Sequence, residues 1–362
     1  MINMQAFCLR TEYILRNGHK LKCLRWHPSL RCLSTDPPHD PKDTIGPPTK
    51  LWRYVVKSLK KLVETSEKKL EKNLPKVYKA YETVKCVRFI TADAKVYFSV
   101  TTDLWTGKEL HTFTRRELEI YQEMPRDFVK VALLLAVASI PFVGNGIFVI
   151  GYWFPHVFFT HHLWNENQKQ EFGQINLKHR INHYHQVLRE IDHIAYRNTE
   201  GAIRDSIMTI LDKIEHSGHP SPEELLSVRE QFQSAPFSLE YLSTRYSRLL
   251  SKVNSLRKSR EKLEQDCLIT LHIDRAMVKE GIDDMQDTEM CRACLKRGLN
   301  PYGLSREERI KFLQAWTTIS QNLDEKGLSL LLHCPVFLTY NAPTNINLMK
   351  GKRYKWRRIS PV

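Results

Sequence analysis

The sequence predicts an all-α protein with a single transmembrane helix followed by a multi-helix domain. Beyond Asn165, apolar residues recur at the three- and four-residue spacing of amphipathic helices almost to the end of the chain,. No segment of useful length alternates apolar with polar residues as a half-buried strand does,. Residues 131–154 form 24 consecutive positions without a charged side chain. A helix of that length is about 36 Å long, which exceeds the roughly 30 Å of hydrocarbon in a bilayer.

The composition is that of a folded protein with an anionic partner or a targeting signal. Of 362 residues, 42% are hydrophobic and 26% are charged, and this balance excludes a collagen-like or wholly disordered chain,. Lys and Arg number 55 against 40 Asp and Glu, an excess of 15 that favours nucleic acid or acidic lipid as a partner,. Eight scattered cysteines do not form a secreted disulfide framework and indicate a reducing compartment,.

Residues 1–33 have the composition of a mitochondrial presequence. Residues 1–35 contain six Lys or Arg and one acid, without an apolar run long enough for a secretory signal,. Arg31 predicts cleavage two residues later, after Leu33, so that the mature chain would begin at Ser34,. A disordered basic tail on a cytosolic or nuclear protein is the alternative interpretation.

A linker and a basic segment follow. Residues 34–49 contain five prolines, which oppose a continuous helix and favour an extended linker,. Residues 50–127 form a basic amphipathic helical segment, and positions 50–95 alone hold thirteen Lys or Arg against five acids,. Such a segment could lie on an anionic bilayer or could be a pair of solvated, lysine-rich helices, and the sequence leaves both possibilities open.

The expected transmembrane helix, with its flanks, occupies residues 128–160. Charged residues end at Lys130 on one side of the apolar stretch, and Tyr152 and Trp153 stand at its other end, where aromatic rings meet headgroups,. A buried core helix is the alternative for a stretch of this kind. The charges on the two sides are too balanced to predict an orientation,.

Residues 166–340, after the apolar stretch, are predicted to form a helical domain, and several of its helix ends can be recognised. Ser221 with Glu224 and Ser305 with Glu308 form capping-box patterns,. Gly281 and Gly298 are suited to end helices, the second of them a helix over residues 287–297,. The pattern also predicts one helix over residues 239–263 and a short helix over residues 328–332 that Pro335 stops. Residues 341–362 form a basic tail.

Several short motifs resemble motifs that occur in one protein family. The motifs are Glu280-Gly281-Ile282, Cys294, Arg297-Gly298-Leu299 and Leu313 with Trp316, preceded by Ser139-Ile140-Pro141-Phe142, Trp153-Phe154-Pro155 and His162-Leu163-Trp164. In that order, over roughly residues 120–340, they resemble the leucine-zipper–EF-hand-containing transmembrane family of the mitochondrial inner membrane, and in particular its short LETM domain-containing branch.

The resemblance implies a span in the inner membrane and a ribosome-binding-type domain in the matrix. It also implies an association with potassium/proton or calcium/proton exchange. This chain lacks an EF-hand calcium loop and a sustained heptad coiled coil,. Its apolar stretch carries no ionisable Asp, Glu, Lys or Arg that could pass protons or cations,. Exchange by this chain alone is therefore not expected.

Two groups of residues, one of histidines and one of cysteines, have spacings that occur in metal or enzyme sites. His179 and His183 stand four residues apart, close to His185 and downstream of His161 and His162, but no acid accompanies them in a zinc-protease arrangement,. Cys291 and Cys294 form a C-x-x-C without a second ligand pair, so that structural thiols are favoured over a redox or zinc site,. No catalytic residue, metal, cofactor or small-molecule substrate is predicted.

Cationic side chains are the candidate binding residues. Arg292, Lys296 and Arg297 cluster at one helix end, and the tail adds Lys350, Lys352, Arg353, Lys355, Arg357 and Arg358 around Tyr354 and Trp356. Cations follow phosphates and rings stack on bases, so this set suits RNA, although the tail could equally be solvated or rest on lipid. Arg297 could instead cap carbonyls of its own helix.

The leading hypothesis is a non-enzymatic mitochondrial inner-membrane protein. Its matrix domain would dock on mitochondrial ribosomes or another matrix assembly and support mitochondrial organisation, and no DNA partner is expected. An accessory subunit in cation/proton exchange is the second hypothesis. A zinc or thiol enzyme that uses the histidines or the C-x-x-C is a distant third.

Overall fold

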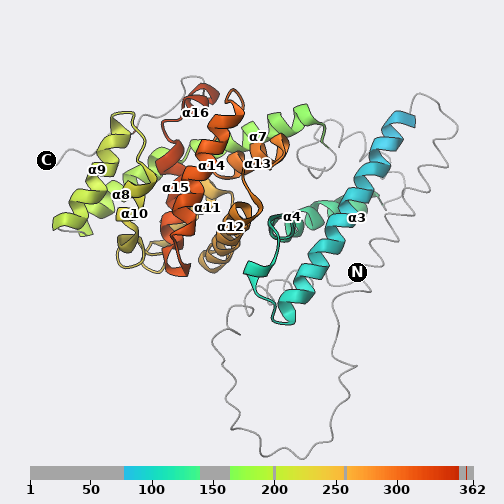
Figure 1. Ribbon diagram of the computed structural model, residues 1–362, viewed down its shortest axis with the longest axis horizontal. Helices are drawn as coiled ribbons and strands as arrows, with labels where there is room; N and C mark the ends of the chain where they lie inside the picture. The colour runs from blue at the N-terminus through green and yellow to red at the C-terminus, as the bar shows by residue number, and fades with distance from the viewer. Residues whose placement is uncertain (1–76, 139–163, 199–200, 257–258, 350–355, 357–362) are drawn as a thin grey trace, which may run out of the picture. The chain divides into compact units, whose positions relative to one another are not determined.

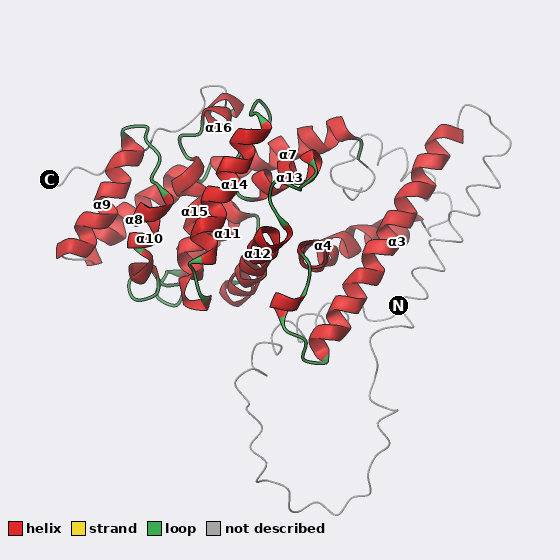
Figure 2. Ribbon diagram, in the orientation of Figure 1, coloured by secondary structure: helices red, strands yellow, loops and turns green. Residues whose placement is uncertain are grey.

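The computed structural model describes residues 77–138, 164–198, 201–256, 259–349 and 356. Several predicted parts lie outside this set: the presequence with Arg31, Leu33 and Ser34, the linker, residues 139–160 of the span region and all six basic residues of the tail. Every regular element of the described residues is a helix, as Figure 2 shows. The all-α prediction is confirmed for this part of the chain.

The chain divides into two compact units. The first contains α3 (Val77–Trp105), the short η4 (Leu110–Thr112) and the larger part of α4 (Arg115–Ala138), and the second contains residues 113–118 and everything from Asn165 onward. The second unit comprises, in chain order (Figure 1), α7 (Glu166–Ile181), α8 (Tyr184–Asn198), α9 (Gly201–Glu215), α10 (Pro222–Ser227), η6 (Arg229–Phe232), α11 (Thr244–Asn254), α12 (Arg260–Glu280), α13 (Asp287–Lys296), α14 (Arg306–Gln321), η7 (Glu325–Gly327), α15 (Leu328–Thr339) and α16 (Pro343–Leu348).

The first unit is held by aromatic packing between α3 and α4. Tyr97 stacks on Tyr121 with ring centroids 5.7 Å apart and meets Phe128 edge-on at 5.4 Å,. Gly107, with a φ of 93°, lies in the turn between the helices, in a conformation that side chains other than glycine rarely adopt,. Residues 77–127, the described part of the predicted basic segment, are mostly helical, because they comprise α3, η4 and the first half of α4.

The predicted transmembrane helix begins inside α4. Residues 131–138 are the last eight positions of α4, and the remainder of the stretch, 139–154, lies outside the described residues. Among the helices that the structure describes, none combines the length and the apolar character that a bilayer crossing requires. The span stays a prediction from the sequence.

The helix ends of the second unit follow local rules. Ser221 and Ser305 accept hydrogen bonds from the backbone N–H groups of Glu224 and Glu308, and the two glutamates return the bond to the caps,. Both predicted capping boxes are confirmed. Gly281 and Gly298 have φ values of 93° and 94°, which places both predicted terminating glycines directly after α12 and after the C-cap of α13,.

Two helix predictions are wrong. The single helix expected over residues 239–263 is two helices, because Ser255 takes a left-handed conformation (φ 54°) that ends α11,. The helix expected to stop at Pro335 continues to Thr339. A proline inside a helix costs about 3 kcal/mol, but α15 is buried along almost its whole length and packs on α8, α11, α12 and α14, so tertiary packing offsets this cost.

A histidine lies at the centre of this packing. His333 is fully buried on α15, its Nδ1 lies 2.6 Å from the Ser329 carbonyl oxygen, and its Nε2 lies 2.6 Å from the Tyr246 hydroxyl of α11. Ser329 O can only accept, so Nδ1 carries the proton, and the Tyr246 hydroxyl donates to Nε2. Burial lowers the pKa of His333 to about 4, since no solvent is present to stabilise the imidazolium ion,.

His333 should make stability depend on pH. The unfolded chain binds the proton near pH 6.5 and the folded chain only near pH 4, so the stabilisation is complete above pH 6.5 and is lost as the pH falls toward 4,. The loss should amount to about 3 kcal/mol. Urea unfolding at pH 7 and pH 4 should therefore show a smaller pH dependence for His333→Gln than for the wild type. His216→Gln, at an exposed position, is the control, and parallel curves for all three proteins would contradict the prediction.

Candidate anion-binding surface

Two helix C-termini of the second unit converge on one buried cation. The Arg180 guanidinium donates from Nε to the Val253 carbonyl of α11 (2.5 Å), from Nη1 to that of Leu295 (2.7 Å) and from Nη2 to that of Lys296 (2.9 Å), the last two in α13. Burial lowers the pKa of Arg180 from its ordinary value, which is so high that the side chain stays charged. Helix C-termini carry partial negative charge, so this cation stabilises both ends and holds them side by side.

The outer face of α11 is basic. Arg245, Arg248 and Lys252 are three and four residues apart, which places them on one face of the helix,. All three are exposed, whereas Tyr246 and Leu250 are buried on the opposite face. The helix contains no acidic residue, and none of the three cations forms an ion pair with a residue that the structure describes. We call Arg245, Arg248 and Lys252 the α11 basic face.

The C-terminal end of α13 lies beside that of α11, and the predicted α13 cations differ in accessibility. Lys252 and Lys296 stand beside the α11 and α13 carbonyl groups that Arg180 binds, so the two basic helix ends are neighbours. Arg292 is partly exposed. Lys296 is half-buried, and its ammonium nitrogen is shielded from solvent.

Arg297 is a core residue, in contrast to the surface contact expected of it. Its side chain is 4% exposed, and both Nε (3.1 Å) and Nη2 donate to Oδ1 of Asp274, a fully buried residue of α12. Nη1 donates to the Ala293 carbonyl at 2.9 Å, which confirms the alternative that Arg297 caps its own helix. The carboxylate also accepts from Trp316 Nε1 on α14 at 2.8 Å, so its two oxygens are both occupied.

The motif Arg297-Gly298-Leu299 has a structural explanation as well. A Cβ atom on Gly298 would lie 2.5 Å from the Tyr184 hydroxyl, so only glycine fits beside α8. The Gly298 carbonyl accepts hydrogen bonds from Thr339 Oγ1 (2.9 Å) and Asn345 Nδ2 (2.8 Å), which connects the motif to α15 and α16. The motif organises the core of the second unit and leaves surface recognition to other residues.

Within the described residues, the histidines and cysteines of the two groups do not come together as a set of metal ligands. His179 lies in the last turn of α7 and His183 in the turn between α7 and α8, and no group of ligand residues in the described part of the chain could hold a metal ion. Cys294 is buried, which raises its pKa to about 12, and burial also raises the pKa of Cys291. A thiol with a raised pKa is neither a good nucleophile nor a ready zinc ligand. Both cysteines are free.

Of the predicted tail, residues 341–362, the structure describes residues 341–349, which include α16, and Trp356. Trp356 is 7% exposed, and its backbone N–H donates to the Tyr340 hydroxyl at 2.9 Å. The ring is therefore not available as the stacking surface for bases that the sequence suggested, because the fold covers it.

The sequence did contain a signal for the α11 basic face. Residues 245–262 hold seven Lys or Arg and one acid, Glu261. The signal was missed because the region reads as one continuous helix, and over a helix that long the cations do not share a face.

Comparisons with known proteins identify a family and several relatives. The family described as "LETM1-like, RBD" matches residues 113–337. LETM1 domain-containing protein 1 of Xenopus tropicalis is 28% identical over 82% of this chain and 87% of its own length, and that of Homo sapiens is 26% identical over 80% and 83%. The mitochondrial proton/calcium exchanger protein of Drosophila melanogaster is 23% identical over 69% of this chain and 25% of its own length. No solved structure matches.

Loss of the buried cation should destabilise the second unit strongly. Arg297→Met leaves the Asp274 carboxylate buried with a single donor, and breaking a buried ion pair in this way costs about 3–5 kcal/mol. The double variant Arg297→Met/Asp274→Asn removes the unpaired charge and keeps an acceptor for Trp316, so it should recover most of the loss. Arg248→Met, on the exposed face, should change stability by less than about 0.5 kcal/mol. Urea unfolding midpoints measure all three, and equal effects of Arg297→Met and Arg248→Met would refute the assignment.

Proposed function

The chain belongs to the LETM1-like family, and on that premise we propose that it is a non-enzymatic protein of the mitochondrial inner membrane whose helical domain docks on mitochondrial ribosomes. The domain would face the matrix, where these ribosomes are. The α11 basic face is the proposed contact surface, and Arg292 of α13 is a further candidate contact. Ribosomal RNA is the anion it would meet, and arginine and lysine side chains bind phosphate groups through charge-assisted hydrogen bonds.

The observation that carries this proposal is the unneutralised charge on α11. Three arginines of the second unit are engaged within the fold: Arg297 with Asp274, Arg180 with three carbonyl groups and Arg309 with Asp287. The α11 basic face instead presents three cations to solvent with no ion-pairing residue among those described. A large polyanion gains the full attraction of such a face, because no ion pair within the protein has to be broken first.

We propose that residues 131–154 anchor the protein in the membrane and that residues 1–33 direct its import. The first proposal is supported by 24 positions without a charge and the second by the acid-poor, arginine-containing N-terminus,. Cleavage after Leu33, guided by Arg31, would leave Ser34 as the first residue. The basic tail, Lys350, Lys352, Arg353, Lys355, Arg357 and Arg358, would add phosphate contacts beside those of the helical domain.

A role as an accessory subunit in cation/proton exchange is the second candidate. It is favoured by the similarity to a protein named as a mitochondrial proton/calcium exchanger. Residues 131–154 contain no Asp, Glu, Lys or Arg, so another chain would have to supply the ionisable groups of an ion pathway.

Neutralising the α11 basic face should weaken ribosome binding and its dependence on salt. In Arg245→Gln/Arg248→Gln/Lys252→Gln, up to three phosphate contacts are lost, so the slope of log affinity against log salt should fall by about 2–3. Co-sedimentation of the detergent-solubilised chain with purified mitochondrial ribosomes from 50 to 200 mM salt measures both quantities.

A matched control distinguishes a specific surface from net charge. Lys279→Gln/Lys311→Gln/Lys326→Gln removes the same charge from exposed positions of α12, α14 and η7, and it should leave binding close to wild type. Equal losses in the two triple variants would show that only net charge matters. No co-sedimentation of the wild-type chain at 50 mM salt would remove ribosome docking and favour a protein or lipid partner.

A further inference from the structure

Arg115 joins two parts of the sequence that the predicted span separates. Its backbone N–H donates to Glu280 Oε1 at 2.7 Å, and its Nη2 donates to Glu289 Oε2, also at 2.7 Å. A second contact, from Nε to Glu280 Oε2, measures 3.5 Å. The Arg115 side chain is 9% exposed. It stands before residues 131–154, whereas both glutamates follow that stretch.

Buried apolar residues next to Arg115 also hold residues 113–118 in the second unit. Phe113 and Leu118, on either side of Arg115, are 4% and 0% exposed. Residues 113–118 belong to the same compact unit as the helices from Asn165 onward, and the family match also begins at residue 113. The start of α4 is therefore an integral part of the C-terminal fold, held by burial as well as by charge.

A second observation, in the other unit, points the same way. Lys130, the last charged residue before the apolar stretch, places its Nζ 5.7 Å from the centre of the Trp164 ring, a distance at which a cation and an aromatic ring attract each other. Lys130 and Trp164 lie at the two ends of residues 131–163. The residues that flank positions 131–163 are therefore in contact with each other.

A single crossing cannot produce either contact. A helix over residues 131–154 would separate its ends by about 36 Å, with roughly 30 Å of hydrocarbon between them. The chain could not return to Lys130 through the lipid in an extended form, because its backbone polar groups would be unsatisfied there. Arg115 and Glu289 would then lie in different compartments, where a 2.7 Å hydrogen bond is impossible.

We infer that the chain segments before and after residues 131–163 lie on the same face of the inner membrane. Arg115 is the residue that fastens the start of α4 to the C-terminal domain on that face. The inference rests on the proposed membrane anchor, and it excludes the single crossing between the two flanks that the sequence predicts. The α3–α4 turn and the ribosome-docking domain would consequently share one compartment.

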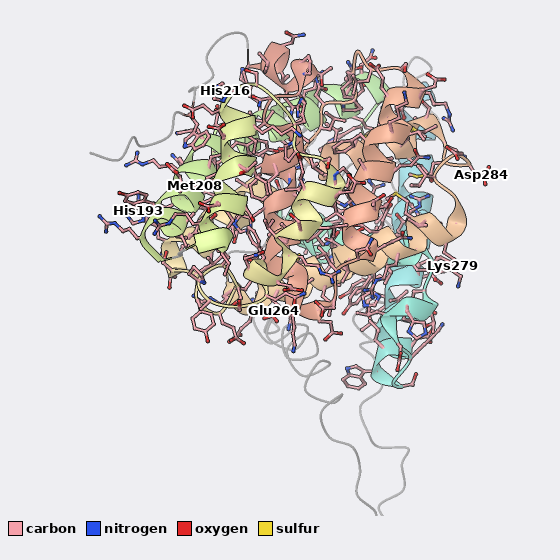
Figure 3. All side chains as sticks on the ribbon, turned by 60° about the vertical axis from the view of Figure 1, so that its left-hand side comes forward. His193, Met208, His216, Glu264, Lys279 and Asp284 are labelled. Atoms are coloured by element: carbon pink, nitrogen blue, oxygen red, sulfur yellow. The ribbon has the colours of Figure 1, made fainter. Side chains whose placement is uncertain are left out.

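Protease accessibility in intact organelles tests the shared face. A site for a specific protease is inserted between Gly107 and Lys108 in one full-length variant and between His216 and Ser217 in another; these residues are exposed, and Figure 3 shows His216 at the surface. Mitoplasts, whose outer membrane is open, and detergent-lysed mitochondria are then treated with the protease. The expected result is protection of both sites in mitoplasts and cleavage of both in detergent.

Each other outcome is decisive. Cleavage of the Gly107 site in mitoplasts while the His216 site stays protected would overturn the inference and restore a single crossing. Cleavage of both sites in mitoplasts would support the shared face and overturn the proposed matrix location. Release of the wild-type protein by alkaline carbonate would overturn the membrane anchor of the proposed function, although both sites would still share their accessibility.

Cross-linking in intact mitochondria tests the contact itself. Arg115→Cys/Glu289→Cys, treated with a short, membrane-permeant bis-maleimide, should give a peptide link between positions 115 and 289 by mass spectrometry. Arg115→Cys/Glu264→Cys is the control, because Glu264 lies 16 residues before Glu280 on α12, about 24 Å along the helix, and Figure 3 shows its side chain at the surface,. A protein that crosses once would give no link in either variant, and that result would overturn the inference.

Discussion

The buried carboxylate of Asp274 is the constraint on which the C-terminal fold depends. A charge with no access to water must find donors within the protein, and Asp274 receives them from Arg297 after α13 and from Trp316 on α14,. Three helices are thereby fixed relative to one another. An ion pair of this kind does not of itself favour folding over an apolar core, because desolvation offsets the attraction. Its effect is to admit only one arrangement of the helices that supply the donors.

A second buried arginine determines what the surface presents. Arg180 binds three helix-terminal carbonyl groups, two on α13 and one on α11, and so places the charged outer side of α11 beside the end of α13. The two interior arginines carry formal charges that never reach solvent. A net charge of +15 therefore overstates the charge of any one surface, and the cations that can attract a polyanion are those left without a partner on the outside of the fold.

Local rules in the sequence predicted the helix boundaries that depend on a few neighbouring residues. The capping boxes at Ser221 and Ser305 and the terminating glycines at 281 and 298 belong to this class, since each is decided within one turn of helix. Pro335 was misjudged because the helix around it is stabilised by burial against helices distant in the sequence. Arg297 was misjudged for the same reason: its partner Asp274 is 23 residues away, and sequence shows that a charge is present but not whether it is buried.

Long-range contacts also bear on whether the apolar stretch, residues 131–154, separates its two flanks across the membrane. Hydropathy measures only whether a segment prefers lipid to water, and a span and an anchor that returns to the same side give the same signal. The distinction comes from residues outside the stretch: Arg115 with its two glutamates, 165 and 174 positions away, and Lys130 beside Trp164. If both flanks lie on one face of the membrane, the lysines of the basic segment and the α11 basic face are in the same compartment. The net charge of +15 then lies on one side of the membrane instead of being split between two sides.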